Sequence, residues 1–232
     1  MKSVSLLSII VPVLNERPII HDFLNHLEKQ SYYENEIIVV DGGSRDGTYE
    51  YLLERKGIQT IRKQTGRAKQ MNAGSKLATG NWFYFVHADC KLPKDYDKIV
   101  LDAVKNGSRA GCFRLDFDST NLLLKCAAYG SRWNHLLCRG GDQTLFIERP
   151  LFFQLNGFDE NYKVCEDINL VRRICKTSHF TVLKNTVETS SRKFHKKGTF
   201  YLWIHFRILH LLHWVKVNPH YLYAYYKKVV GF

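Results

Sequence analysis

The first half of the chain alternates short apolar runs with segments of helical periodicity. Residues 8–14 form an apolar run with several β-branched side chains, which is typical of a buried strand. Residues 17–30 follow with apolar positions three to four residues apart, the spacing of one helix face. Residues 36–40 and 48–55 repeat this order around a Gly-rich turn. The pattern therefore predicts two successive strand–helix units.

A third unit continues the pattern, with a strand over 58–61, a helix over 67–78 and a further strand over 81–86. Strands that alternate with helices predict right-handed βαβ units and a mostly parallel sheet. Such sheets bind ligands beyond the carboxyl ends of their strands. In this chain 41–46 and 87–89 follow strands and carry carboxylates, so we expect the chemistry there.

The second half is less regular, and its pattern predicts shorter elements. We expect strands at 110–117, 143–147 and 180–183 and helices at 122–137 and 169–175. The chain shows neither an internal repeat nor a linker rich in Pro, Gly or Ser. The expected organisation is therefore one α/β domain over 1–195, followed by a helical tail over 196–232.

Composition fits a folded protein with an excess of positive charge. The 232 residues are 45% hydrophobic, which excludes a disordered chain, and the formal net charge is +12. Such an excess suits nucleic acid, an anionic membrane or a polyphosphate substrate, so charge alone selects none of them. The six cysteines form no CxxC pair, and Pro12 interrupts the apolar N-terminal run where no small-residue cleavage site follows. We expect reduced cysteines and a cytoplasmic protein.

Six motifs occur in order along residues 8–167. They read SIIVPVLNE (8–16), VDGGSRDGT (40–48), GRAKQMNAG (66–74), FVHAD (85–89), GFDE (157–160) and ED (166–167). Together they resemble the family 2 glycosyltransferases, which have the GT-A fold. The resemblance implies an inverting transferase that moves a sugar from a nucleotide-sugar donor, UDP being favoured, to an acceptor hydroxyl. It covers about residues 6–175 and extends weakly to 190–193.

The resemblance implies that Asp41 contacts the base of the nucleotide and that Asp46 approaches the ribose. A carboxylate facing a base N–H or ribose hydroxyls makes a strong, selective hydrogen bond. Both aspartates could instead close the Gly-rich turn or cap the next helix. Further donor-pocket residues implied by the resemblance are Pro12, Glu16 and Gly43, although Glu16 could equally cap the helix that Pro18 opens.

Other matched residues would lie beside the diphosphate and the sugar. Arg67 offers a planar fork for phosphate oxygens at the positive end of a helix, and Asn72 belongs to the same motif. The resemblance also places Gln143 and Asp142 near the sugar and acceptor, and Arg192 in a basic segment that folds over the diphosphate. His87 and Ala88 complete the donor-binding set.

A divalent metal, Mn²⁺ or Mg²⁺, is the cofactor that the resemblance implies. His87-Ala88-Asp89 stands where most relatives have Asp-X-Asp, so Asp89 keeps the ligand that usually coordinates the metal. Imidazole suits Mn²⁺ better than Mg²⁺, and His195 is a candidate further ligand. The literal Asp-X-Asp at 116–118 lacks the matching context and is expected to be a decoy.

Asp167 is the expected general base that takes the proton of the acceptor hydroxyl, with Glu166 as its neighbour and runner-up and Asp142 as a further candidate. Paired carboxylates raise one pKa toward the working range. The alternative is that this acidic pair only stabilises the first turn of a helix.

The tail has an apolar stripe at Tyr201, Ile204, Ile208, Leu212 and Val215, with Arg207, His210, His213 and Lys216 at intervals of three. We expect an amphipathic helix that is too short and too charged to span a bilayer. It would dock on the domain or lie in a membrane interface, at the inner face of the membrane. The second option would bring a lipid-linked acceptor to the enzyme.

Two other function classes fit the pattern less well. A sugar nucleotidyltransferase would carry a Gly-rich basic signature in the first strand–helix loop, where this chain has Pro12 to Glu16. A binding module for nucleic acid would carry a recognised motif, and none is present, so we expect no nucleic-acid partner. The expected partners are a nucleotide-sugar donor and a hydroxyl acceptor on a glycan or a lipid.

Overall fold

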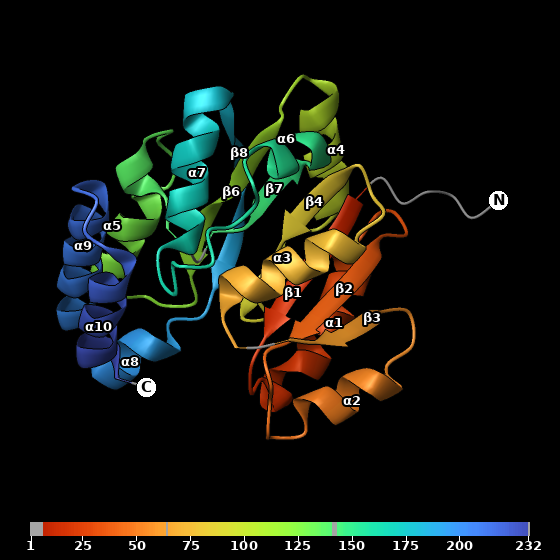
Figure 1. The fold of residues 1–232 in the computed structure, drawn as a ribbon, viewed down its shortest axis with the longest axis horizontal. Coiled ribbons are helices and arrows are strands. Elements are labelled where there is room, and N and C mark those ends of the chain that lie inside the picture. The colour runs from red at the N-terminus through yellow and green to blue at the C-terminus, as the bar shows by residue number, and fades with distance from the viewer. Residues whose placement is uncertain (1–6, 64, 141–142, 232) are drawn as a thin grey trace.

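The computed structural model of the chain describes residues 7–63, 65–140 and 143–231. It contains one eight-stranded sheet with helices on both faces (Figure 1). The strands are β1 (Leu7–Val13), β2 (Glu36–Asp41), β3 (Gln59–Arg62), β4 (Trp82–Phe85), β5 (Cys90–Lys91), β6 (Ala110–Phe117), β7 (Leu145–Glu148) and β8 (Phe180–Thr189). The helices are α1 (Arg17–Gln30), α2 (Thr48–Glu54), α3 (Arg67–Leu77), α4 (Tyr96–Lys105), α5 (Leu122–Gly130), α6 (Arg149–Gln154), α7 (Glu166–Thr177), α8 (Arg192–Lys197), α9 (Thr199–Trp214) and α10 (Pro219–Val230), with a 3₁₀ turn at Leu136–Cys138.

The strand order is β3-β2-β1-β4-β7-β6-β8-β5. The first four strands pair in parallel, as the alternating pattern predicted. Beyond β4 the sheet is mixed, because β7 pairs antiparallel with both β4 and β6 while β6 and β8 are parallel. The α/β class is confirmed, and the carboxyl ends of β1, β2 and β4 meet at one edge.

The buried strand β1 divides the core into two layers. Ile9 and Val11 belong to the layer that α1, α2 and α4 cover, whereas Ile10 belongs to the layer that α3, α6 and α7 cover. Successive strand residues point to opposite faces, so both layers are apolar. A Cβ added at Gly74 of α3 would lie 2.5 Å from Ile10 Cγ2, so this helix packs directly on the sheet.

The predicted helix over 122–137 is wrong in its second half. The helix ends at Gly130, and residues up to the 3₁₀ turn form an irregular segment. The guanidinium of the buried Arg139 donates to the Ser131 carbonyl at 2.9 Å and also to the Trp133 carbonyl. Hydrogen bonds from this buried side chain to two backbone carbonyls therefore replace the continued helix here. The pattern also missed β5, α4, α6 and α8.

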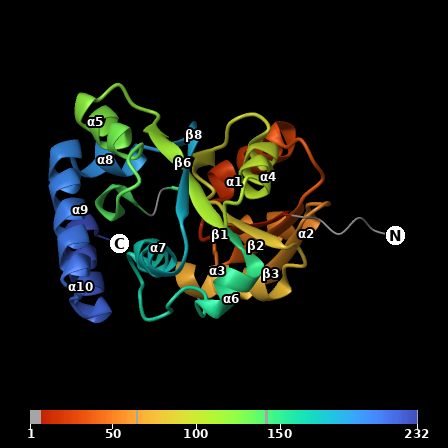
Figure 2. The same cartoon turned by 90° about the horizontal axis from the view of Figure 1, so that it is seen from above.

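The tail forms α9 and α10, which pair with each other next to α5 and α8 (Figure 2). Phe194, Leu202 and Val229 join a third apolar cluster with α5. The predicted polar stripe is wrong at His213, which is 3% exposed and meets the Tyr162 ring edge to face. Burial, with Arg172 nearby, lowers the pKa of His213 to about 4. Within the described part of the chain, no helix is long and apolar enough to cross a membrane.

Candidate active site

The loops after β1 and β2 are tied together at the edge of the sheet. The amide of Asn15, which has φ +55°, donates to Ser44 Oγ at 2.8 Å, and the amide of Glu16 donates to Thr48 Oγ1 at 2.9 Å. Pro12 is buried in β1, opposite Val40 of β2. Glu16 therefore stands at the carboxyl end of β1, at the start of α1.

Asp41 and Asp46 make the contacts of the loop-closing alternative. The fully buried carboxylate of Asp41 accepts from the amides of Gly43 at 2.9 Å and Ser44 at 3.1 Å, and from Arg62 Nε at 3.0 Å. Asp46 accepts from the amides of Arg17 and Thr48 and from Thr48 Oγ1, and these bonds lower its pKa although its slight burial opposes them. Both aspartates shape the loop.

Gly43 adopts φ +95° with open space where a Cβ would stand. Glycine reaches this left-handed region without steric cost, and its amide caps the Asp41 carboxylate. The loop after β2 therefore depends on the buried carboxylate of Asp41 and on a glycine at position 43, where the backbone has a positive φ.

Two side-chain pairs bring α3 and β4 to the start of α7. Arg67 Nη1 lies 3.9 Å from Glu166 Oε1, and His87 Nε2 lies 3.9 Å from Asp167 Oδ2. His87, Glu166 and Asp167 are buried, while Arg67 is 43% exposed. The structure therefore joins three motifs that lie up to 100 residues apart in the sequence.

The pKa of Glu16 depends on the charged side chains around the site. Burial raises its pKa, and the neighbouring Asp89 raises it further, while Arg192, Lys193 and Arg67 oppose this shift. One carboxylate and three cations, from the segment after β4, α3 and α8, therefore act on Glu16 at the start of α1. This mixture suits a diphosphate, because the cations attract it and a divalent metal can bridge it to the carboxylates.

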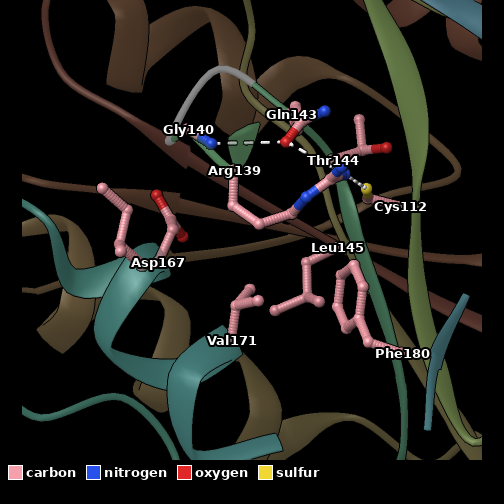
Figure 3. A pocket seen from close by; sticks show the side chains of 10 residues that line it. Cys112, Arg139, Gly140, Gln143, Thr144, Leu145, Asp167, Val171 and Phe180 are labelled. Atoms are coloured by element: carbon pink, nitrogen blue, oxygen red, sulfur yellow. Dashed lines mark hydrogen bonds between the residues drawn. The ribbon is translucent and has the colours of Figure 1, made fainter. Parts of the chain in front are cut away.

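Asp167 also borders a small pocket beneath the segment before β7 (Figure 3). Its lining also includes Gln143, Thr144, Arg139 and Cys112. Gln143 Oε1 accepts from Gly140 N at 3.3 Å and Arg139 Nη1 at 3.5 Å, whereas its buried Nε2 has no partner among the described residues. Asp142 lies outside the described residues, so its predicted role stays a prediction.

Asn72 is not brought to this edge in the way its motif implied. Its amide is saturated by the α6–α7 loop, donating to the Phe158 carbonyl and Glu160 Oε1 and accepting from the Phe158 amide, all at 2.9–3.0 Å. Gly157 has φ +61°, and a Cβ there would lie 2.7 Å from Asn72 Oδ1. Asn72 thus fastens α3 to the loop that leads into α7, a positioning role rather than a donor contact.

The donor set for a metal is small. No cluster of three His, Cys, Asp or Glu side chains occurs in the described ranges. Asp89 supplies a hard carboxylate oxygen next to buried Ala88, with Glu16 as its charged neighbour, while His195 is exposed on α8. Mg²⁺ in transferases is often held by one or two carboxylates plus substrate phosphates, so this set fits a cation that arrives with a diphosphate.

Both aspartates of the Asp-X-Asp at 116–118 bind other residues of the chain. Asp116 pairs with Lys125 Nζ at 2.8 Å, and Asp118 accepts from the Ser191 amide at 2.6 Å.

Arg139 and Lys193 lie near the site but were not among the predicted site residues. Arg139 belongs to none of the six motifs, and its partners Ser131, Trp133 and Cys112 become apparent only in the folded chain. Lys193 belongs to a basic run that begins at Arg192.

Comparison with known proteins decides the family. The model described as "Glycosyl transferase family 2" matches residues 8–158, more than half of the chain. The chain belongs to glycosyl transferase family 2. It is therefore a glycosyltransferase, and the resemblance of the six motifs is confirmed. The match favours sugar transfer over the nucleotidyltransferase alternative.

Relatives and solved structures agree with this family. An uncharacterized glycosyltransferase of Haemophilus influenzae is 23% identical over 83% of this chain and 69% of its own length. A PGL/p-HBAD biosynthesis glycosyltransferase of Mycobacterium bovis is 29% identical over 69% of this chain and 66% of its own. The chain thus spans about two thirds of the length of these two relatives.

Two solved structures share the fold. S. aureus TarS 1-349 in complex with UDP has a TM-score of 0.68 at 18% identity, covering 97% of this chain and 70% of that one. The mannosyltransferase PcManGT from Pyrobaculum calidifontis, in complex with GDP-Man and Mn²⁺, has a TM-score of 0.67 at 20% identity, covering 99% and 69%. The GT-A fold of this family 2 chain is therefore confirmed.

Proposed function

We propose that the chain is an inverting transferase that moves a sugar from a nucleotide-sugar donor, with UDP favoured, to the hydroxyl of a glycan or lipid-linked acceptor. The observation that carries the proposal is the pairing of His87 with Asp167 and Arg67 with Glu166, each at 3.9 Å, beside the charges around Glu16. This arrangement offers cations for a diphosphate and a carboxylate for a proton within one site. The UDP and GDP-Man complexes of TarS and PcManGT support the donor class.

In the proposed reaction, Asp167 accepts the proton of the acceptor hydroxyl as its oxygen attacks the anomeric carbon. The new C–O bond forms opposite the diphosphate, the old one breaks, and configuration inverts. Arg67, Arg192 and Lys193 stabilise the negative charge on the departing nucleoside diphosphate. His87, buried against Asp167, holds that carboxylate in place.

We assign the divalent metal to Asp89, with Glu16 as the nearest further carboxylate. When bound there it would act as a Lewis acid for the diphosphate oxygens. His195, exposed on α8, stays a predicted further ligand. We keep base contact by Asp41 and ribose contact by Asp46 as parts of the proposal, with Pro12 and Gly43 in the same wall. Because Asp41 is fully buried in this structure, its base contact would require the loop after β2 to rearrange.

We also propose that the enzyme acts in the cytoplasm, where nucleotide sugars and reduced thiols coexist. Cys90 and Cys112 are buried thiols, and reduced thiols are typical of cytosolic proteins. Burial raises the pKa of Cys112 to about 11, so this thiol stays protonated and unreactive next to the site.

The test is release of nucleoside diphosphate from a panel of UDP- and GDP-sugars, with and without Mn²⁺. Asp167→Asn should lower turnover by about 10²–10⁴-fold, the usual contribution of a general base, while nucleotide binding persists. Asp89→Asn should remove the response to Mn²⁺.

The matched control is Asp116→Asn, which changes the other Asp-X-Asp and should keep full turnover. Retained turnover in Asp167→Asn would contradict its role and move the base to Glu166 or Asp142. If Asp116→Asn lost its response to Mn²⁺ as fully as Asp89→Asn, the assignment of the metal to Asp89 would be contradicted.

A further inference from the structure

The outward side of α9 is apolar except at Arg207. Phe200, Ile204, Arg207, Leu211 and Trp214 follow one another at intervals of four and three residues, so they share one face of the helix. Phe200, Leu211 and Trp214 are 66%, 54% and 57% exposed. The opposite side, with Leu202 and Leu209, is buried against the domain.

A surface helix on a soluble domain normally turns polar residues to water. Here Arg207 is the single charged side chain of the five that form this stripe, and its guanidinium lies over the Trp203 ring, 5.6 Å from the centroid. We call the stripe from Phe200 to Trp214 the α9 face. Its exposed apolar side chains, Phe200 at one end and Leu211 with Trp214 at the other, are of the kind that marks an interaction surface.

Charge identifies what would cover this face. After Glu188 the sequence contains no Asp or Glu, but it contains eight Lys or Arg, so this segment carries +8 of the formal net charge of +12. The eight are Arg192, Lys193, Lys196, Lys197, Arg207, Lys216, Lys227 and Lys228. Lys196 and Lys197 precede the α9 face and Lys216 follows it, and all three are exposed. Cations therefore flank an apolar stripe at both ends.

We propose that the α9 face docks on an anionic lipid bilayer, with the helix axis parallel to the membrane. Apolar side chains with flanking Lys and Arg are the composition of helices that lie in the headgroup region. Trp rings are favoured at that depth, and basic residues are attracted by anionic lipids. The 16 residues of α9 span about 24 Å, less than the apolar thickness of a bilayer, so the helix lies on the surface.

A second copy of the chain fits the α9 face less well. A two-fold contact through this face would bring Arg207 toward the same residue of the other copy, with lysines at both ends and no acidic residue after Glu188 to neutralise them. Nucleic acid would meet a largely apolar stripe rather than a row of cations. The anionic bilayer is the partner that matches both the apolar surface and the charge.

The same basic segment reaches the catalytic edge. Arg192 and Lys193, at the start of α8, act on Glu16, and α8 ends at Lys197 just before α9 begins. Its six residues span about 9 Å. An enzyme docked through the α9 face therefore holds its donor side near the bilayer. The docking itself does not rest on sugar transfer, and its test requires no sugar.

The experiment is co-sedimentation of the full chain with vesicles of phosphatidylcholine alone, or with about one third phosphatidylglycerol, at low and high NaCl. The wild type should bind the anionic vesicles at least about tenfold more tightly than the neutral ones, and salt should weaken this binding. Leu211→Glu with Trp214→Glu should reduce binding at least about tenfold, because two apolar anchors become anionic.

The matched control is Leu53→Glu, which changes an equally exposed leucine on α2. It should bind like the wild type, and thermal melts should show that both variants are folded. A wild type that stays in the supernatant with anionic vesicles at low salt would overturn the proposal. It would also be overturned if the α9 variant bound as tightly as the wild type, or if the face dimerised or bound RNA without binding vesicles.

Discussion

Replacing Asp41 by Asn tests how the loop after β2 is held. The carboxylate is fully buried and accepts two backbone amides and the guanidinium of Arg62. Asparagine has the same shape, but it keeps one oxygen and turns an N–H₂ group toward a donor that needs an acceptor. We expect Asp41→Asn to destabilise the fold and to disorder the loop.

The magnitude follows from these contacts. A hydrogen bond to a charged group contributes about 1.5–3 kcal/mol, and a buried donor left without a partner loses a similar amount. Arg62 is 43% exposed, so water screens its pairing with Asp41 and reduces that part to about 1 kcal/mol or less. The expected cost is about 3 kcal/mol. For a chain of this size it lowers Tm by about 6–12 °C.

The assay is a thermal melt of Asp41→Asn beside Asp46→Asn. Asp46 lies on the surface before α2, where Asn accepts amide hydrogen bonds as well as Asp, so this control should lose less than about 1 kcal/mol. An Asp41→Asn protein that melts within 1 °C of the wild type would refute the reasoning. If that stable variant had also lost nucleotide binding, Asp41 would contact the base instead.

Two further predictions concern the scaffold around the site. Asp97 accepts from Ser31 Oγ, Asn35 Nδ2 and the amides of Tyr32 and Tyr33; burial raises its pKa, but these hydrogen bonds outweigh it and the pKa is lowered. The ionised Asp97 therefore stabilises the fold fully above about pH 4, and this stabilisation is lost as the pH falls through the lower pKa of the folded state. When Tm is measured against pH, the Tm of Asp97→Asn should fall less steeply in acid than that of the wild type. Parallel curves would contradict this. Gly74→Ala should lower the free energy of unfolding by about 1–3 kcal/mol in denaturant, because its Cβ would meet Ile10 Cγ2 at 2.5 Å. Gly130→Ala, where a Cβ would stand in open space, should leave the free energy of unfolding almost unchanged. Equal losses in the two variants would refute the packing argument.

The parallel half of the fold is predictable because its signals are local. Each of β1, β2 and β4 is a short apolar run, and α1 begins and ends at the residues that periodicity indicated. Later elements depend on distant partners. The helix predicted over 122–137 ends at Gly130, where the buried guanidinium of Arg139 binds the Ser131 carbonyl, a contact that helical periodicity does not reveal.

The same difference governs the tail and the site. Both sides of α9 are apolar, so spacing alone could not tell which side faces the domain, and the predicted polar stripe placed a buried His213 in water. Motifs identified the residues that gather at the sheet edge. Motifs could not show that Asn72 binds a loop 86 residues away, since that pairing exists only in the folded chain.

The most direct test of sugar-nucleotide use is a thermal-shift titration of the purified chain with UDP, GDP, CDP and dTDP, each with and without Mn²⁺. A nucleotide that binds only the folded state at 100 times its Kd adds about 2.7 kcal/mol, or about 5–11 °C in Tm at this chain length. The account predicts such a shift for one nucleotide, UDP, dependent on Mn²⁺ and lost in Asp89→Asn. No shift with any nucleotide, with or without the metal, would contradict it.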